Sequence, residues 1–276
     1  MFRRKALLLF IAIIMTLLFN NVAIAEEAIS ANLIAEATGK TECKIIGYSY
    51  WGTIINSIVI TPKNYDKTML LTFAMHGFED GWSNDGASLV QIATDVIKEF
   101  SSNPEQLNRT RLIVVPCVNP DGTWYGQSSN GFGRCNAQGI DINRDFDYYW
   151  KYCNESRFRT GTTAFSTPEA QILRNVVLLE KPDIIIDFHG WLNQTYGDIE
   201  LGEYFNRAFN IQHQGPAFKD KVYMHQYFAG WASQYARTVL VEYPNPKNNQ
   251  NIIDWGYSKN TINVIKEICS LIQPVS

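Results

Sequence analysis

The stretch TMLLTFAMHGFE, residues 68–79, decides how the rest of the chain is interpreted. Its apolar first part predicts a buried strand. The strand stops at a His-Gly pair, where Gly77 allows the backbone to turn sharply. His76 and Glu79 could then converge at the edge of a sheet. Imidazole nitrogen and carboxylate oxygen are zinc ligands, so this pair would supply half of a metal site. The alternative is a strand-end histidine bonded to a carbonyl, with Glu79 in solvent.

The start of the chain has the pattern of an export signal. A basic segment at residues 3–5 precedes an apolar run over residues 6–19, and Ala-Ile-Ala at residues 23–25 is a small-x-small cleavage site. The run is shorter than the roughly 20 apolar residues that span a bilayer. We therefore expect residues 1–25 to be a cleaved signal peptide, residues 26–276 to form one catalytic domain, and the mature protein to be exported.

Composition and charge exclude several classes of partner. The formal net charge is −3, and it becomes more negative when residues 1–25, which carry three basic residues and no acids, are removed. This balance excludes a nucleic-acid or anionic-membrane binder. The 46% apolar and 18% charged composition is typical of a globular domain with one core. We expect a monomer that makes no membrane contact after signal cleavage.

The cysteines are too few and too scattered for a disulfide scaffold. There are five, and no two form a Cys-x-x-Cys pair. Export permits a bridge, and Cys135–Cys153 is one possible pair, although sequence alone does not establish pairing. The odd count leaves at least one thiol free or paired with another chain.

Strands and helices alternate along the rest of the chain. Thr167-Pro168-Glu169 has the N-cap, first-turn proline and acid of a helix start. The alternation predicts an α/β fold, a three-layer sandwich with a mixed, mainly parallel central sheet and helices on both faces. The expected strands cover residues 43–50, 54–61, the run ending at His76, 111–118, 183–188 and 238–241; the expected helices cover 86–100, 168–180, 229–235 and 258–272; the expected loops cover 119–165 and 245–251.

Polar residues follow four of the predicted strands: His76 with Glu79, residues 119–122, His189 and Glu242. In parallel sheets, sites lie at the carboxyl ends of the strands. Taken alone, each of these histidines is more often structural. Together, His76, Glu79 and His189 form the ligand set of a catalytic zinc ion, with one position left for water.

The order and spacing of these motifs resemble the zinc carboxypeptidase family, whose namesake is carboxypeptidase A. The similarity covers about residues 45–265, and no propeptide-like segment is recognised ahead of it, which fits the compact bacterial branch. The motifs that carry the similarity are residues 46–49 with Gly52, 76–79 (HGFE), 119–122 (NPDG), 139–146 (GIDINRDF), 167–169 (TPE), 187–190 (DFHG) and 240–242 (LVE).

The resemblance implies a role for each matching residue. His76, Glu79 and His189 would bind one Zn²⁺ per chain, which lowers the pKa of bound water to about 7 and polarises a peptide carbonyl. Glu242 would be the general base that takes the proton of this water and passes it to the leaving amine. Arg134 would stabilise the developing oxyanion. The alternatives are a surface ion pair for Glu242 and a surface loop position for Arg134.

Three further residues are implied in substrate binding. Asn143 and Arg144 match the pair that binds the terminal carboxylate of the substrate, for which a planar guanidinium is suited; a structural arginine bonded to loop carbonyls is the alternative. Asp145 stands where the family has Asn, and an acid there could weaken or reorient the carboxylate grip. Tyr223 is the candidate for the family's mobile tyrosine that covers bound substrate, and Tyr227 also lies at a plausible distance before Glu242; a core or wall position is the alternative for both.

The resemblance implies an exported zinc metallocarboxypeptidase that hydrolyses a peptide bond near a free carboxylate. Its substrates would be cell-wall peptides, for example at the γ-D-glutamyl–diaminopimelate bond, or other extracellular peptides. One rival is a non-catalytic peptide-binding module on the same fold, against which the intact residue set argues. Another is a serine hydrolase, but residues 126–130 (GQSSN) lack the final glycine of a nucleophile elbow.

Overall fold

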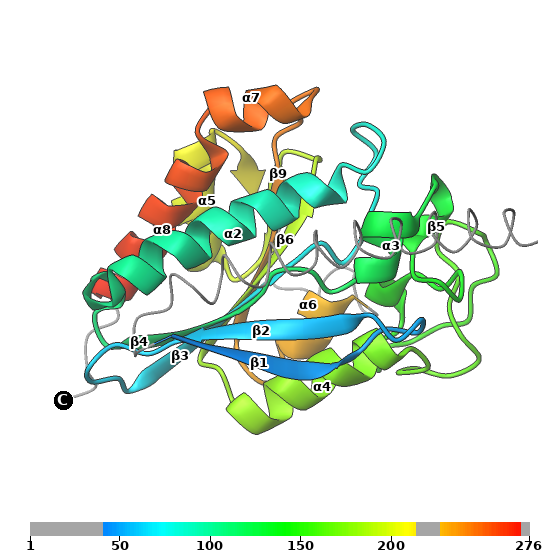
Figure 1. The fold of residues 1–276 in the computed structure, drawn as a ribbon, viewed down its shortest axis with the longest axis horizontal. Coiled ribbons are helices and arrows are strands. Elements are labelled where there is room, and N and C mark those ends of the chain that lie inside the picture. Colours follow the sequence, from blue (N-terminus) through cyan, green and yellow to red (C-terminus); the bar gives the residue numbers. More distant parts are fainter. Residues whose placement is uncertain (1–40, 214–226, 272–276) are drawn as a thin grey trace, which may run out of the picture.

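The computed structural model describes residues 41–213 and 227–271. The predicted signal peptide and the candidate Tyr223 lie outside the described residues. One eight-stranded sheet lies between two layers of helices, as Figure 1 shows. This architecture is the predicted three-layer α/β sandwich. No helix within the described ranges combines the length and the apolar composition needed to cross a bilayer.

The sheet is mixed, with its parallel part at the centre. Its strand order is β1-β2-β4-β3-β6-β9-β7-β8. The four central strands β4, β3, β6 and β9 are parallel, whereas β2 is antiparallel to β4 and β7 is antiparallel to β9. The predicted early hairpin is the antiparallel pair β1 and β2. The strands of the sheet are β1 (Thr41–Tyr48), β2 (Ile54–Ile60), β3 (Lys67–Phe73), β4 (Thr110–Val115), β6 (Ile184–Gly190), β7 (Gln194–Gly197), β8 (Gln212–His213) and β9 (Arg237–Tyr243).

Alternate side chains of the central strands pack against the two helical layers. Leu71 and Ile186 belong to a buried cluster with α2, α5 and α8, whereas Leu70 and Ile185 belong to a second cluster with α4 and α6. Because successive strand residues point to opposite faces and both faces are covered, these strands are continuous apolar runs. The helices of the two layers are α2 (Gly86–Ser102), α5 (Ile199–Phe209), α7 (Asn249–Asp254) and α8 (Tyr257–Leu271), and, on the other face, α4 (Pro168–Glu180) and α6 (Phe228–Ala232) (Figure 1).

The start of α4 follows the predicted helix signal. The hydroxyl of Thr167 accepts a hydrogen bond from the N–H of Ala170 at 3.2 Å, and Pro168 is the first helical residue. Both features relieve the unpaired N–H groups of the first turn. The helix ends at Glu180, and Lys181 adopts a left-handed conformation with φ of 46°.

The prediction of one long loop over residues 119–165 is wrong in part. That segment contains α3 (Pro120–Tyr125) and β5 (Ser128–Cys135), which lie side by side. A Cβ on Gly126 would lie 2.2 Å from the Cα of Gly133, so glycine is needed there for close packing and not for a loop. The sequence also gave no signal for β7, β8 or α5, and α7 begins inside the expected loop over residues 245–251.

All five cysteines are free thiols. The bridge considered between Cys135 and Cys153 is therefore not formed. Cys135 is buried, and its Sγ lies 3.4 Å from the carbonyl oxygen of Ser156, to which it donates. Burial raises the pKa of this thiol to about 12, which keeps it protonated and unreactive.

The central strands should carry most of the stability. Replacing the fully buried Ile186 in the Ile186→Ala variant should lower the free energy of unfolding by about 2–5 kcal/mol, because it leaves a cavity between the sheet and α2. Urea unfolding followed by circular dichroism, with a chelator present, measures the change. The Leu179→Ala variant, at a position 80% exposed on α4, should change it by less than about 0.5 kcal/mol. Similar losses in both variants would contradict this assignment.

Candidate metal centre

Three parallel strands bring the polar motifs to one edge of the sheet. His189, in β6, is directly paired with Glu242 in β9. His76 and Glu79 lie in the loop that follows β3, which is the neighbour of β6 on its other side. Because β3, β6 and β9 are parallel, all four side chains lie at their carboxyl ends, where sites form in such sheets.

The loop after β3 depends on Gly77. A Cβ at this position would lie 2.3 Å from the backbone of Gly122 in α3, so only glycine allows the loop to pack there. The carbonyl of Gly77 also accepts the N–H of Gly86 at the start of α2, at 3.0 Å. The loop is thus held between α2 and α3, which orients the side chains on either side of Gly77.

Three buried side chains form a compact group of possible metal ligands. The two oxygens of Glu79 face the two histidines: His76 Nδ1 lies 3.0 Å from Oε2, and His189 Nδ1 lies 3.0 Å from Oε1. All three residues are at most 4% exposed, and their ligand atoms lie within 4.8 Å of one another. Two imidazole nitrogens and a carboxylate suit zinc, and they leave a coordination position for water or substrate.

Each histidine is oriented by a second carboxylate. Asp141 Oδ1 lies 2.9 Å from His76 Nε2, and Asp187 Oδ2 lies 3.0 Å from His189 Nε2. The hydroxyl of Thr72 donates to the other oxygen of Asp187 at 2.6 Å. With Nε2–H donated to a carboxylate, the lone pair of each imidazole in its neutral form is on Nδ1, the atom that faces Glu79. This arrangement of donors fits a zinc ion.

The sequence interpretation gave Asp141 and Asp187 no role. Asp187 lies two residues before His189 in a strand, so the two side chains share a face of the sheet. This spacing within a predicted strand could have identified Asp187 as a partner of His189 from the sequence. The other orienting contact joins residues 65 positions apart, and nothing local in the sequence marks it.

Asp85, which the sequence did not single out, holds the loop that carries Glu79. Its carboxylate accepts the N–H of Glu79 and of Gly81, at 2.5 and 2.6 Å, and the indole N–H of Trp191 at 2.8 Å. Asp85 is fully buried. A buried carboxylate is stable only when its oxygens are satisfied, so these three donors and the loop conformation support one another.

The electrostatics of the metal-free group follow from burial and close charges. Burial would raise the pKa of Glu79, but the two neighbouring histidines override it and lower the pKa to about 2. Burial would lower the pKa of His189, but the charges of Asp187 and Glu79 raise it well above its usual value. Burial raises the pKa of Glu242 to about 8, an effect that the charge of Glu79 reinforces.

Glu242 lies beside the metal group but does not belong to it. It is the residue of β9 directly opposite His189. Its Oε2 is shielded from solvent and has no hydrogen-bond partner among residues 41–213 and 227–271. A half-buried carboxylate with an open oxygen and a raised pKa is suited to accept and return a proton.

Arg134 comes from β5 and reaches the same group. Its Nη1 lies 3.9 Å from Glu79 Oε2, and its Nε lies 3.6 Å from Asp141 Oδ2. These separations are ion-pair distances but longer than hydrogen bonds. The guanidinium is therefore close to the metal group and 6% exposed, while its Nε makes no hydrogen bond within the described part of the chain.

Asn143 and Arg144 belong to the 3₁₀ turn at Ile142–Arg144. The Asn143 side-chain oxygen accepts the N–H of Phe228 at 2.9 Å, and its amide nitrogen lies 3.5 Å from His189 Nε2. The guanidinium of Arg144 stacks on the ring of Tyr227 at 4.0 Å. Its Nη1 donates to the carbonyl oxygen of Asn143 at 3.0 Å, as in the structural alternative, while the stacking holds the plane of the remaining donors, which are suited to a carboxylate.

Asp145 does not disturb Arg144. Its carboxylate accepts hydrogen bonds from the Ser166 hydroxyl at 2.8 Å and from the N–H and hydroxyl of Thr167 at 2.7 and 2.9 Å. The expectation that this acid could weaken or reorient the carboxylate grip is therefore wrong. Asp145 instead fixes the loop that leads into α4.

A buried His-Glu-His group with carboxylate-backed imidazoles, at the carboxyl edge of a three-layer α/β sandwich, defines a mononuclear zinc hydrolase centre. Residues 27–267 match the family described as zinc carboxypeptidase. The chain belongs to that family. The family and the ligand group together define a zinc metallopeptidase with one zinc ion.

Three known proteins are similar to the chain. Bacteriocin BCN5 of Clostridium perfringens is 29% identical over 213 residues, which are 74% of this chain and 23% of the relative. Murein peptide amidase A of Escherichia coli K12 is 34% identical over 116 residues, 37% of this chain and 46% of the relative. The chain thus matches less than half the length of both relatives. Carboxypeptidase A from Helicoverpa armigera has the same fold, with a TM-score of 0.70, 17% identity and coverage of 87% of this chain and 71% of that one.

Removing a carboxylate that orients a ligand should weaken zinc binding. Asp187→Asn should lower zinc affinity about 10–100-fold, because the amide no longer fixes the tautomer and basicity of His189. Competition with a chromophoric chelator measures the affinity. The matched Asp183→Asn variant, whose carboxylate pairs with Lys67 at the other end of β6, should keep it. An unchanged affinity in Asp187→Asn would contradict the role given to this residue.

Zinc affinity should also rise with pH. In the metal-free protein the raised pKa of His189 keeps its imidazole protonated at neutral pH, and zinc must displace that proton. Raising the pH removes the competitor, so affinity should increase about tenfold per pH unit until the pH passes the raised pKa. The same titration of Asp187→Asn should level off at lower pH, since a charge that raises this pKa is gone. A zinc affinity that does not change between about pH 5 and 8 would contradict the predicted rise with pH.

Proposed function

We propose that the protein is an exported zinc-dependent metallocarboxypeptidase that hydrolyses a peptide bond near a free C-terminal carboxylate. The observation that carries the proposal is the arrangement around the metal group: Glu242 with an open oxygen on one side, and Arg134 and Arg144 as the nearby cations. Export is supported by the signal pattern at residues 1–25.

Zinc held by His76, Glu79 and His189 would polarise the scissile carbonyl and lower the pKa of a neighbouring water. Glu242 would take one proton from this water as its oxygen bonds to the carbonyl carbon. It would then give that proton to the amine nitrogen as the C–N bond breaks, so that the products are an amine and a carboxylic acid, which loses its remaining proton to solvent. The pKa of about 8 in the metal-free site favours this return of the proton, and a bound cation would lower it toward the working pH.

The arginines would serve two different parts of the substrate. Arg134, close to Glu79 and Asp141, is placed to donate to the carbonyl oxygen as negative charge develops on it. Arg144, stacked on Tyr227, would bind the terminal carboxylate with the guanidinium donors that are not used by the Asn143 carbonyl, together with the amide nitrogen of Asn143. Tyr223 stays a candidate for covering the substrate.

Cell-wall peptides are the substrate class that we favour. The support is the similarity to murein peptide amidase A and a signal pattern that would take the protein past the membrane. Ordinary extracellular peptides are the second candidate, because binding of a terminal carboxylate is common to both. A non-catalytic peptide-binding module would need none of the groups that act on water, and the chain has Glu242, Arg134 and all three ligands.

Glu242→Gln should abolish turnover without removing zinc. We expect a rate loss of about 10²–10⁴, because the amide cannot accept the proton of water, and one zinc per chain as in the unchanged protein. Mass spectrometry of products from a γ-D-glutamyl–diaminopimelate peptide and from linear peptides measures the rate. The matched Glu203→Gln variant, at an exposed position on α5, should keep full activity.

The products distinguish the candidate functions. Cleavage next to diaminopimelate would support a cell-wall role, whereas stepwise loss of C-terminal residues from linear peptides would support a general carboxypeptidase. Zinc-loaded protein that cleaves neither, or a Glu242→Gln variant as active as the unchanged protein, would overturn the proposed mechanism.

A further inference from the structure

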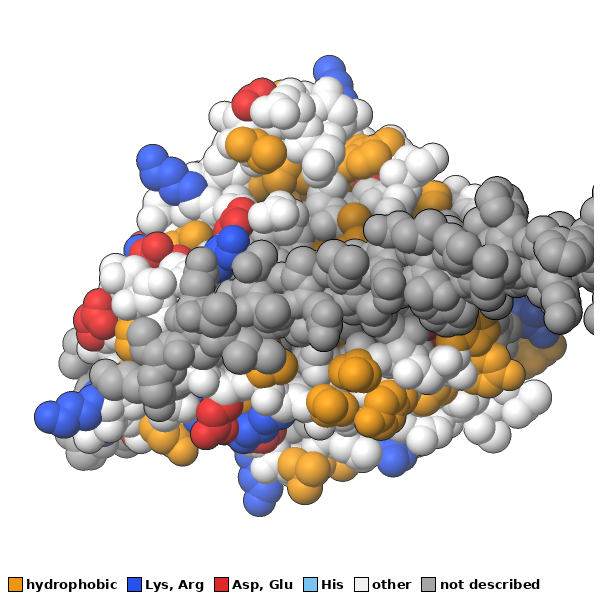
Figure 2. Space-filling model, in the orientation of Figure 1, with side chains coloured by type: hydrophobic (Ala, Val, Ile, Leu, Met, Phe, Trp, Pro, Cys, Tyr) orange, Lys and Arg blue, Asp and Glu red, His pale blue; other side chains and the backbone are white. Residues whose placement is uncertain are grey.

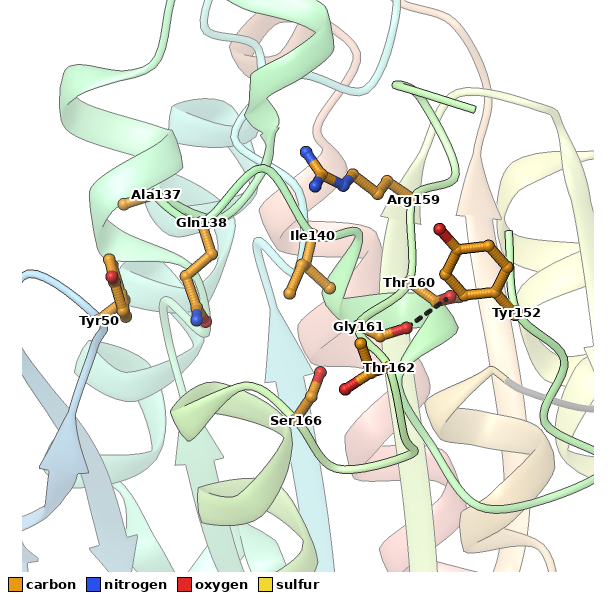
Figure 3. A pocket seen from close by; sticks show the side chains of 10 residues that line it. All are labelled: Tyr50, Ala137, Gln138, Ile140, Tyr152, Arg159, Thr160, Gly161, Thr162 and Ser166. Carbon is orange, nitrogen blue, oxygen red and sulfur yellow. Dashed lines mark hydrogen bonds between the residues drawn. The ribbon is translucent and has the colours of Figure 1, made fainter. Parts of the chain in front are cut away.

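A cavity of about 670 Å³ lies outside the metal centre, against the loop that leads from β5 to α4. None of the metal-site side chains lines it. Its volume is within the range of sites for small molecules, roughly 300–1,000 Å³. Figure 3 shows the residues that line it, among them Tyr50, Gln138, Ile140, Tyr152, Arg159 and Thr162.

The lining is rich in uncharged hydrogen-bonding groups and has one cation. Gln138 and Thr162 contribute an amide and a hydroxyl. The guanidinium of Arg159 lies beside the Gly139 turn, and no carboxylate within the described ranges pairs with it. Its donors are therefore available to a ligand, and they fit oxygen acceptors.

Two tyrosine rings form opposite sides of the cavity, as Figure 3 shows. Tyr50 is 53% exposed and Tyr152 is 63% exposed, so both rings are accessible. The N–H of Tyr50 donates to the buried Glu169 at 3.1 Å, which fixes the backbone of this wall. The apolar faces of rings this exposed are in contact with water. A ligand with an apolar face that stacks on the rings removes this surface from water.

The aromatic surface continues beyond the cavity. Trp51, next to Tyr50, is 55% exposed, and its ring lies 4.9 Å from that of Phe132 and 6.1 Å from that of Tyr125. Figure 2 shows hydrophobic side chains gathered over β1 and β2 and toward the end of the molecule that carries α3 and β5. A ligand longer than one ring could extend from the cavity onto this surface.

This combination fits a saccharide. Sugar rings present apolar C–H faces that stack on tyrosine, and hydroxyl and acyl oxygens that bond to amide, hydroxyl and guanidinium groups. A phosphate ligand fits less well, because the first N–H groups of α4 are already bonded to Asp145 and to the Thr167 hydroxyl. An extended peptide would need backbone groups along a strand edge, whereas no residue of this lining belongs to a strand.

The cavity and the metal centre share a wall. Ile140 lines the cavity, and the next residue, Asp141, orients His76. The carbonyl of Arg159 accepts the N–H of Asp141 at 2.7 Å. A ligand in the cavity therefore lies against the segment that supports the metal group.

We propose that this cavity binds a saccharide unit, and, in a step that rests on the proposed function, a saccharide carried by the peptide substrate. The saccharide stacks on Tyr152 and Tyr50 and bonds to Arg159, Gln138 and Thr162. Recognition at this site selects substrates that carry a sugar, whereas the metal centre acts on the peptide.

Titration of the zinc-loaded protein with two probes, the trisaccharide of N-acetylglucosamine and glucuronic acid, tests the binding by calorimetry. We expect at least one probe to bind saturably. Tyr152→Ala and Arg159→Gln should each weaken it about three- to tenfold, while Tyr65→Ala, an exposed tyrosine before β3, should not change it. Hydrolysis of a sugar-free peptide should be the same in all three variants.

Failure of both saccharides to bind would overturn the proposal, as would binding that neither Tyr152→Ala nor Arg159→Gln weakens. The Glu242→Gln variant separates this result from the proposed function, because it should bind the saccharide normally while it no longer hydrolyses peptide. Saccharide binding without any hydrolysis by the unchanged protein would contradict the peptidase function alone. Hydrolysis without saccharide binding would contradict the cavity assignment alone.

Discussion

The metal centre of this protein depends on one constraint. Both histidines present Nδ1, and not Nε2, to Glu79. An imidazole has two nitrogens, and the proton on one decides whether the other can bind a metal. Asp141 and Asp187 each accept from an Nε2, and Thr72 holds Asp187 in turn. The ligand set is therefore arranged before any metal binds.

This arrangement places acids in the interior. Asp141 and Asp187 are fully buried, Glu79 is 4% exposed, and Arg134 is the cation closest to two of the three. Burial of a charge costs several kcal/mol unless close partners compensate. A bound dication would supply the missing positive charge, so metal binding and folding stability should be coupled. Apolar burial on both faces of the central strands helps to offset this free-energy cost.

The sequence predicted those parts of the molecule that local chemistry determines. Apolar runs marked β3 and β6, Thr167 marked the start of α4, and His189 was identifiable at the end of a buried strand. His76 was identifiable in the same way, although β3 ends at Phe73 and not, as predicted, at His76. The contacts around the metal group could not be predicted in the same way. Most of them join residues far apart in the chain, as in the bond between His189 and Glu79, and depend on how the strands pack.

The remaining errors have two physical causes. Glycines at residues 122–133 were interpreted as loop residues, although they allow α3 and β5 to approach closely. The acid Asp145 was judged by its neighbour Arg144 in sequence, although its partners, Ser166 and Thr167, are about twenty residues further along the chain. In both cases a tertiary contact decides the role, and neighbouring residues carry no signal for it.

X-ray absorption spectroscopy at the zinc edge tests the central claim most directly. The account predicts that the zinc-loaded protein has a first shell of nitrogen and oxygen at about 2.0–2.2 Å, with the multiple scattering of two imidazoles and no sulfur. Loss of one imidazole from this shell in His189→Ala would identify the ligand. A sulfur shell near about 2.3 Å, or an unchanged spectrum in His189→Ala, would contradict the account.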